Sequence, residues 1–288
     1  MKLLMLINAH SGVRNSKAKL IDALDIFSAH GYDVSVYVTQ KKNDAYDYLL
    51  KCKESYDVLC VFGGDGTMNE VTNALMQLDH KPLLGYFPSG TMNDFGSNFD
   101  LGTDFKHIAE RICAGEVREF DVGQFNDSFF NYVAAFGAMC DVPFTTNRES
   151  KEILGNVAYI LEGINKLPEI RSHHVTYQIN GREYTKDVLF GLIYSGNQVA
   201  GMQLAERKNG KIDDGNFNVL IVDYVQSFLN TPDVLTTLIN QKRYIHHYFS
   251  GEISLCFDDD IIWTLDGEEA HGQKADIVIH NKALKMLA

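Results

Sequence analysis

Apolar and polar residues follow two different rhythms along the chain, and the change comes near residue 117. In the first part, short apolar runs cover residues 3–7, 58–62 and 83–87, and residues 33–39 alternate between polar and apolar as a strand does. Between them, apolar residues recur every three or four positions, which is the spacing of one face of a helix. Strands that alternate with helices of this length predict βαβ units and a mostly parallel sheet.

Residues that commonly cap helices mark the ends of the expected helices. One helix runs up to Gly31, a second opens at Asn43, and a fourth runs from Thr103 to Ala114. The third is expected over 67–78 with Thr67 as its cap. Asn and Thr side chains accept N–H groups at helix starts, and glycine readily takes the left-handed conformation at helix ends.

The second part reads mainly as antiparallel strands. "HVTYQINGREYT" (174–185) alternates on both sides of Asn180-Gly181, the strongest short signal for a hairpin. Further strand-like runs lie at 130–135, 188–195, 216–223, 253–257, 261–265 and 276–279. Helical patterns are limited to about 150–167 and 232–240. This rhythm predicts a β-sandwich or barrel.

Composition narrows the class of protein. Lys plus Arg number 26 against 38 Asp plus Glu, a net charge of −12, which argues against nucleic acid as a partner. The five cysteines are odd in number and form no C-x-x-C pair, so we expect reduced thiols in a cytoplasmic protein. No apolar run approaches the length of about 18 residues that a transmembrane helix needs.

Three loops of similar chemistry follow strands of the expected parallel sheet. They are "NAHSG" (8–12), "GGDGT" (63–67) and "PSGTMND" (88–94). Ligands bind where such βα loops gather, at the carboxyl ends of the strands. Glycines, hydroxyls and N–H groups suit phosphate, whereas the carboxylates of Asp65 and Asp94 suit its magnesium ion. We expect both carboxylates to face solvent in one crevice.

Together with "KIDDGNF" (211–217) and "LDGEE" (265–269), these motifs resemble the diacylglycerol kinase catalytic domain family, in particular its bacterial soluble lipid kinases. Sphingosine and ceramide kinases share this domain. The resemblance implies an α/β plus all-β fold, with a nucleotide-binding domain similar to those of NAD kinases and phosphofructokinases and a C-terminal β-sandwich. It places residues 1–122 with 280–288 in the nucleotide domain and residues 123–279 in the lipid-substrate domain.

The same resemblance implies an ATP- and Mg²⁺-dependent kinase that phosphorylates the hydroxyl of diacylglycerol to phosphatidic acid in phospholipid metabolism. Such an enzyme is cytoplasmic and meets its membrane-lipid acceptor by transient peripheral contact at the inner membrane surface. The family often dimerises, and a homodimer is a possible assembly of this chain. The alternatives are a kinase for a sphingoid, ceramide-type or NAD acceptor, and a catalytically silent regulator that binds lipid or nucleotide.

Site residues follow by position within the motifs. The resemblance makes Glu268 the proton acceptor with Asp266 beside it, and puts Asp65 and Asp94 in the network of magnesium and phosphate. A structural magnesium ion is expected on the Asp214 side chain and the main-chain carbonyls of Lys211 and Asn216. The residues expected to contact ATP are Asn8, Ala9, His10, Ser11, Gly12, Thr39, Gly63, Gly64, Asp65, Gly66, Thr67, Met68, Asn69, Glu70, Gly90 and Thr91.

The chain departs from the family pattern at two places. Ala9 stands where the family usually has proline, and "RKNG" (207–210) replaces the usual Ala-Pro-x-Ala. The basic clusters at 171–174 and 241–247 are read as a solvated face, with a membrane-docking surface as the competing reading.

Overall fold

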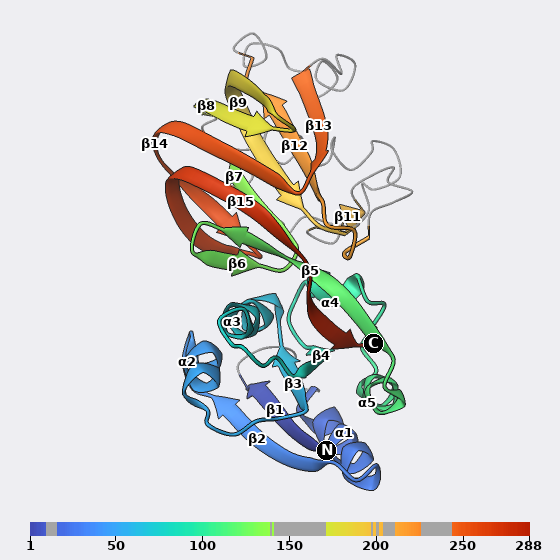
Figure 1. Ribbon diagram of the computed structural model, residues 1–288. Coiled ribbons are helices and arrows are strands. Elements are labelled where there is room, and N and C mark those ends of the chain that lie inside the picture. The colour runs from blue at the N-terminus through green and yellow to red at the C-terminus, as the bar shows by residue number, and fades with distance from the viewer. Residues whose placement is uncertain are drawn as a thin grey trace. The chain divides into compact units, whose positions relative to one another are not determined.

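The computed structural model describes residues 1–9, 16–138, 140, 171–196, 198–199, 202–203, 211–225 and 244–288 (Figure 1). The chain divides into two compact units. Unit 1 comprises Met1–Val122, Phe129–Asn131 and His280–Ala288, and unit 2 comprises Gly123–Ser128 and Tyr132–Ile279. The helical patterns predicted at 150–167 and 232–240 lie outside the described residues.

Unit 1 is built on a parallel sheet. Its strands are β1 (Lys2–Asn8), β2 (Asp33–Thr39), β3 (Val58–Gly63) and β4 (Leu83–Pro88), in the spatial order β2-β1-β3-β4. The end of β15 (Glu268–Leu287) joins beside β4, where Met286 pairs with Leu84 in parallel. All six residues of β3 are buried, as expected for the apolar centre of a sheet covered on both faces.

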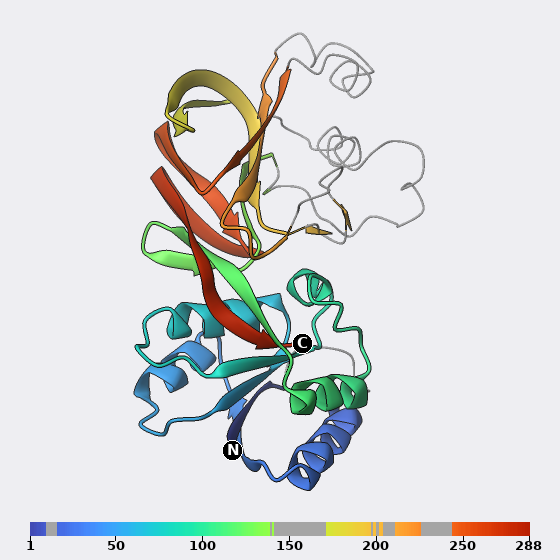
Figure 2. The same cartoon turned by 45° about the vertical axis from the view of Figure 1, so that its right-hand side comes forward.

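Helices cover both faces of this sheet. α1 (Ser16–Ala29) and α5 (Phe105–Ala114) lie together on one face, and α2 (Asp44–Lys51) and α3 (Asp65–Leu75) lie on the other (Figure 2). α4 (Asp94–Ser97) is a single turn after β4. α5 ends at Ala114 as predicted, and Gly115 takes a φ of 78° after it. Its start was predicted at Thr103, but the helix begins at Phe105, because the Asp104 carboxylate accepts the N–H of Lys106 and makes Asp104 the N-cap residue.

The predicted start of the third helix was wrong. α3 begins at Asp65, directly after the strand, with Gly64 as its N-cap residue. Thr67 therefore lies inside the first turn, and its buried hydroxyl accepts a hydrogen bond of 2.9 Å from the Asn8 side chain. Gly64 has an extended backbone and no side chain to cap the first turn of α3, so the position that Thr67 was expected to occupy is filled by a residue without a capping group.

Unit 2 consists mainly of antiparallel strands. They are β7 (Val133–Gly137), β8 (His173–Ile179), β9 (Arg182–Tyr194), β12 (Phe217–Asp223), β13 (Ile245–Ser250), β14 (Glu252–Leu265) and the first part of β15. The order is β13-β12-β9-β7-β14-β15, and β8 pairs with both β9 and β14. The remaining strands are β5 (Val117–Phe125), β6 (Ser128–Phe130), β10 (Gln198–Val199) and β11 (Met202–Gln203).

The hairpin predicted at 174–185 is confirmed. Asn180 and Gly181 have φ values of 51° and 70° and join β8 to β9 in a two-residue turn. Trp263 is fully buried, and its ring packs 4.8 Å from that of Phe136 and 4.9 Å from that of Phe125. This cluster is part of the core of unit 2.

The mixed α/β character of the chain, with a large share of sheet, is confirmed. The likeness to NAD kinases and phosphofructokinases, the C-terminal β-sandwich and the assignment of nucleotide and lipid to separate domains stay predictions. Within the described part of the chain, every helix is too short or too polar to cross a membrane.

Candidate active site

Two of the three predicted loops lie in backbone contact at the carboxyl ends of β3 and β4. The N–H of Ser89 donates to the carbonyl of Gly63 at 2.9 Å. A Cβ built on Gly90 would lie 2.7 Å from the Cα of Gly64, and one built on Gly64 would lie 3.1 Å from the Cα of Gly90. The glycines are therefore needed for this close approach.

The Asp65 carboxylate connects these loops. Its oxygens accept the N–H groups of Asp94 at 3.3 Å and of Phe95 at 3.2 Å, the first two residues of α4. The N-cap residue of α4, Asn93, makes no side-chain cap bond to the helix, because its amide instead bonds both main-chain groups of Gly90 at 2.8 Å. Asp65 thus caps α4 from the first residue of α3.

Asp94 departs from expectation. Its side chain is only 1% exposed, whereas Asp65 is half-buried, so the expectation that both carboxylates face solvent was wrong. The reason is that α4 folds its first turn against Asp65 and carries Asp94 inward. The structure brings the two residues together where the two loops meet, with Asp94 buried there and Asp65 half-buried.

Tyr86 of β4 lies close to this pair and was missed in the sequence. The Tyr86 ring is fully buried, and its hydroxyl has no hydrogen-bond partner among the described residues. Burial, together with the nearby Asp65 carboxylate, holds the pKa of the Tyr86 phenol well above its ordinary value. A tyrosine inside an apolar strand gives no sequence signal for such a position.

The side chains expected at the neighbouring strand ends gather at the same edge. Asn8 ends β1 and bonds Thr67, while the Thr39 hydroxyl at the end of β2 donates to the carbonyl of Ile7 at 3.4 Å. Thr91 is exposed on its loop. His10, Ser11 and Gly12 lie outside the described residues.

Three residues expected to contact ATP have side chains engaged elsewhere. Met68 is fully buried in the core. The Glu70 carboxylate accepts the N–H groups of Asn43 at 2.8 Å and Ala45 at 3.2 Å, and so caps α2. The Asn69 amide donates to the carbonyl of Phe129 at 3.1 Å. These contacts give all three residues a structural role in supporting the loop.

In unit 2, Asp266 and Gly267 form the two-residue turn between β14 and β15, with φ values of 52° and 90°. One Asp266 carboxylate oxygen accepts the N–H groups of Tyr132 at 3.0 Å and Val133 at 3.2 Å, and the residue is 4% exposed. Glu268, which follows the turn, is half-buried. The two acidic residues therefore have different environments, and Asp266 holds the turn to the start of β7.

The segment expected to hold a structural metal is a compact turn. The Asp214 carboxylate accepts the N–H of Asn216 at 3.1 Å, and the Asn216 amide donates to the carbonyl of Asp214 at 2.9 Å. One carboxylate with main-chain carbonyls is an oxygen donor set that suits a hard cation. Over the described ranges, no group of three or more His, Cys, Asp or Glu residues is arranged to hold a metal ion.

A further buried carboxylate, Asp121 of β5, was also missed. It is 1% exposed and accepts hydrogen bonds from the Asn281 amide at 2.8 Å and the Lys282 N–H at 2.7 Å. These bonds fasten the returning C-terminal segment within unit 1. An acidic residue between Phe120 and Val122 in a buried run was the available signal.

Comparison with known proteins first gives the class. Residues 2–125 match the model of the diacylglycerol kinase catalytic domain family, which makes this chain an enzyme of the kinase type. A diacylglycerol kinase of Staphylococcus saprophyticus is 30% identical over 270 residues, covering 92% of this chain and 88% of that protein. One from Staphylococcus aureus is 33% identical over 244 residues, covering 84% and 76%. The chain belongs to the diacylglycerol kinase family.

Solved structures agree on the fold. The crystal structure of a diacylglycerol kinase from Bacillus anthracis superposes with a TM-score of 0.76 at 21% identity, over 99% of this chain and 96% of that one. A second structure from the same organism reaches a TM-score of 0.80 at 24% identity with the same coverage.

Proposed function

We propose that the protein transfers the γ-phosphate of ATP to the hydroxyl of diacylglycerol, which yields phosphatidic acid for phospholipid metabolism. Membership of the diacylglycerol kinase family supports this reaction. The observation that carries it is the contact between Gly64 and Gly90 at the amino end of α3. Backbone without Cβ atoms at a helix N-terminus is a favourable place for phosphate groups.

The residues at this edge fit a nucleotide. Gly63, Gly64, Gly66 and Gly90 give main-chain access to the phosphates, and the side chains of Asn8, Thr39, Thr67 and Thr91 supply hydroxyl and amide groups. We assign Ala9, His10, Ser11 and Gly12 to the same site from the sequence. The loop is supported from within α3 by the structural contacts of Met68, Asn69 and Glu70 described above.

A divalent metal, which we propose to be Mg²⁺, would be held near the phosphates by Asp65 and Asp94. When bound, it would neutralise charge on the phosphate oxygens. A second, structural Mg²⁺ would be held by the Asp214 carboxylate and the carbonyls of Lys211 and Asn216. The oxygen-only donor set at that turn supports the assignment.

The protein's own part in the reaction is to accept a proton and to position the reactants. The diacylglycerol hydroxyl gives its proton to a carboxylate. The hydroxyl oxygen forms the new bond to the γ-phosphorus, and the bond between the γ-phosphorus and the oxygen of the departing ADP breaks. We assign the proton acceptor to Glu268. Asp266 supports the turn beside it, because its carboxylate already accepts two main-chain N–H groups.

The acceptor lipid lies in a membrane, so the proposal includes transient peripheral contact with the inner membrane surface by a cytoplasmic protein. The net charge of −12 repels an anionic bilayer, and such contact needs a local basic patch. A homodimer is compatible with the proposal and is not required by it.

A lipid-panel assay tests the proposal. The purified protein is incubated with Mg²⁺ and γ-³²P-ATP, and diacylglycerol, ceramide, a sphingoid base and NAD are offered in separate mixed-micelle or aqueous reactions. We expect label in phosphatidic acid. If only another acceptor becomes labelled, that acceptor and not diacylglycerol is the substrate. ATP binding by calorimetry without label in any acceptor would make the protein a nucleotide-binding regulator.

A further inference from the structure

Tyr86 places a polar atom inside unit 1, on the face of the sheet that α2 and α3 cover. Successive side chains of a strand point to opposite faces of its sheet. The ring of Phe87 in β4 lies 6.2 Å from that of Phe27 in α1, so Tyr86 points to the opposite face. There its ring lies 5.9 Å from that of Phe95, and a Cβ built on Gly96 would lie 3.2 Å from the Tyr86 Cε1 atom. The phenol therefore packs against the single turn of α4.

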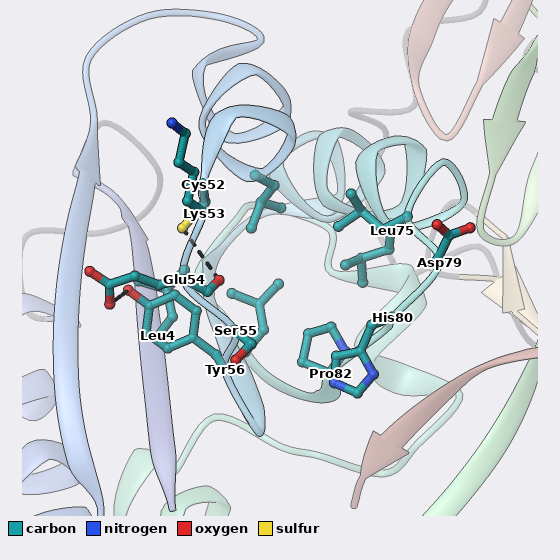
Figure 3. A pocket seen from close by; sticks show the side chains of 13 residues that line it. Leu4, Cys52, Lys53, Glu54, Ser55, Tyr56, Leu75, Asp79, His80 and Pro82 are labelled. Atoms are coloured by element: carbon teal, nitrogen blue, oxygen red, sulfur yellow. Dashed lines mark hydrogen bonds between the residues drawn. The ribbon is translucent and has the colours of Figure 1, made fainter.

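Along the sheet, Tyr86 lies on the side of the candidate active site. It stands two residues before Pro88, which ends β4 at the carboxyl edge. The surface hollow of unit 1 opens at the amino edge instead, where Ser55 precedes β3 and Pro82 precedes β4 (Figure 3). The leucines behind that hollow are almost fully buried, so the hollow stays at the surface and takes no part in the arrangement around Tyr86.

The Tyr86 hydroxyl is a buried hydrogen-bond donor. Tyr86 is fully buried, and among the described residues its hydroxyl has no hydrogen-bond partner. Phenylalanine would fill the same space without burying an unsatisfied polar atom, which is costly, and such atoms in native proteins often serve binding or catalysis. Burial and then the charge of Asp65 hold the pKa of the phenol well above its ordinary value, so the hydroxyl keeps its proton at neutral pH and can donate it to an acceptor.

The Asp65 carboxylate is the acceptor that the fold offers. Asp65 opens α3 on the same face of the sheet, and its oxygens accept the N–H groups of Asp94 and Phe95, in the turn against which the phenol packs. At 3.3 and 3.2 Å, these bonds are longer than the commonest N–H···O length of about 2.9–3.0 Å, so they hold the carboxylate weakly. A carboxylate offers about four lone-pair sites, and a further donor can join these two N–H groups.

We propose that Tyr86 is a positioning residue of the phosphoryl-transfer site: its hydroxyl donates a hydrogen bond to the Asp65 carboxylate once Mg²⁺ and ATP are bound, and thereby fixes the orientation in which Asp65 holds the metal. The inference rests on the proposed kinase function. When one Asp65 oxygen turns toward the metal, its bonds to the α4 N–H groups weaken, and the carboxylate takes the Tyr86 hydroxyl as a new donor. Hydrogen bonds of this kind orient a metal-binding carboxylate, and their loss typically costs roughly 10–100-fold in metal affinity or activity.

The test compares Tyr86→Phe, which removes only the hydroxyl, with the unaltered full-length protein. Calorimetry gives the affinity for ATP at increasing Mg²⁺ with no lipid acceptor present, and the lipid-kinase assay gives kcat at the same Mg²⁺ concentrations. We expect the apparent Mg²⁺ constant to rise roughly 10–100-fold in Tyr86→Phe, with the affinity for ATP in EDTA unchanged. The ligand-free variant should unfold in urea no more easily than the unaltered protein, because no described residue bonds the hydroxyl.

Tyr177→Phe is the matched control, because it also removes one hydroxyl from a fully buried tyrosine. Tyr177 belongs to unit 2, and its hydroxyl is hydrogen-bonded to the Tyr248 hydroxyl at 3.1 Å. Loss of that bond should lower the unfolding free energy but leave the Mg²⁺ constant unaltered. An equal rise of the Mg²⁺ constant in Tyr177→Phe would reflect a general loosening of the protein and would overturn the proposal.

The remaining outcomes separate this inference from the proposed reaction. Equal Mg²⁺ constants in Tyr86→Phe and the unaltered protein overturn the role of Tyr86 and leave the reaction intact. A ligand-free Tyr86→Phe that unfolds more easily overturns that role as well, because the hydroxyl then has a structural partner. If the Mg²⁺ constant rises as expected but no lipid is labelled, the role of Tyr86 holds and only the reaction fails. ATP binding that does not depend on Mg²⁺ in the unaltered protein overturns both.

Discussion

Gly64 and Gly90 approach each other so closely that a methyl group on Gly90 would come within 2.7 Å of the Gly64 Cα. The two residues belong to loops that follow different strands, so this contact fixes the spacing of both loops at the carboxyl edge of the sheet. The same methyl group would also lie 2.9 Å from the Asn93 amide oxygen, which the Gly90 N–H needs as its acceptor. Neither neighbour can move freely.

Gly90→Ala should therefore lower both stability and nucleotide affinity, because backbone atoms have to separate to admit the methyl group. Gly64→Ala is the graded control, since its Cβ would lie 3.1 Å from the Gly90 Cα and the backbone φ of −91° suits alanine. We expect the thermal midpoint to fall further in Gly90→Ala than in Gly64→Ala, measured by calorimetry with and without ATP. The reverse order would show that the loops are not in contact in solution.

Asp65 has a structural role as well as the proposed role with phosphate and metal. Asp65→Ala leaves the N–H groups of Asp94 and Phe95 without their acceptor and should cost about 1–2 kcal/mol of unfolding free energy. Asp65→Asn keeps one acceptor oxygen and should cost less, yet it removes the charge. Both variants should lose turnover, so near-normal turnover in Asp65→Asn would remove the carboxylate from the chemistry. Urea unfolding and the lipid-kinase assay measure the two effects separately.

Local patterns in the sequence predicted the elements well. The apolar patterns predicted the strands of unit 1. Asn180-Gly181 predicted the hairpin of unit 2, because a two-residue turn there needs two residues with positive φ. The loops at 63–67 and 88–94 were placed at one edge by the rule for parallel strands alone. The strands and the hairpin depend on neighbours within a few positions of the chain, whereas the placement of the two loops depends only on the order of parallel strands and helices.

Contacts between segments that are far apart in the sequence could not be predicted from such local patterns. Asp266 accepts N–H groups of Tyr132 and Val133, which lie more than 130 positions earlier, and no periodicity announces that pairing. The burial of Asp94 likewise depends on how α4 turns back onto Asp65. The carboxylates of Asp266 and Asp65, which look like surface chemistry in the sequence, thus accept main-chain N–H groups in the fold.

The stability of unit 1 should fall on mild acidification because of His280. Burial, and then the positive charge of Lys81, lowers the pKa of His280 below its ordinary value, and its ring packs 5.8 Å from that of Phe129. The unfolded chain takes up the proton first as the pH falls, so unfolding free energy decreases below the unfolded pKa of about 6.5 and levels off below the folded pKa.

Urea unfolding across this pH range measures the effect, and NMR titration of the His280 ring gives its pKa directly. His280→Asn should show a flatter loss of stability on acidification than the unaltered protein. Lys81→Met removes the neighbouring charge and should raise the His280 pKa. An unaltered protein whose His280 titrates above the ordinary value would contradict the assignment.

Glu268 and Asp266 can be separated by comparing stability with turnover. Glu268→Gln keeps the size and hydrogen bonding of the side chain but cannot accept a proton at neutral pH. It should lower kcat by roughly 10²–10⁴-fold, leave ATP affinity almost unchanged and preserve the unfolding free energy. Asp266→Asn is the matched change two residues earlier, where the left-handed φ of 52° suits asparagine equally well.

Asp266→Asn should behave in the opposite way. Its carboxylate is 4% exposed and accepts the N–H groups of Tyr132 and Val133, and a neutral amide accepts these bonds more weakly. We expect a loss of about 1–2 kcal/mol in unfolding free energy, measured in urea, with a smaller loss of kcat than in Glu268→Gln. If Glu268→Gln keeps near-normal kcat and Asp266→Asn is stable but inactive, the proton acceptor is Asp266 and our assignment is wrong.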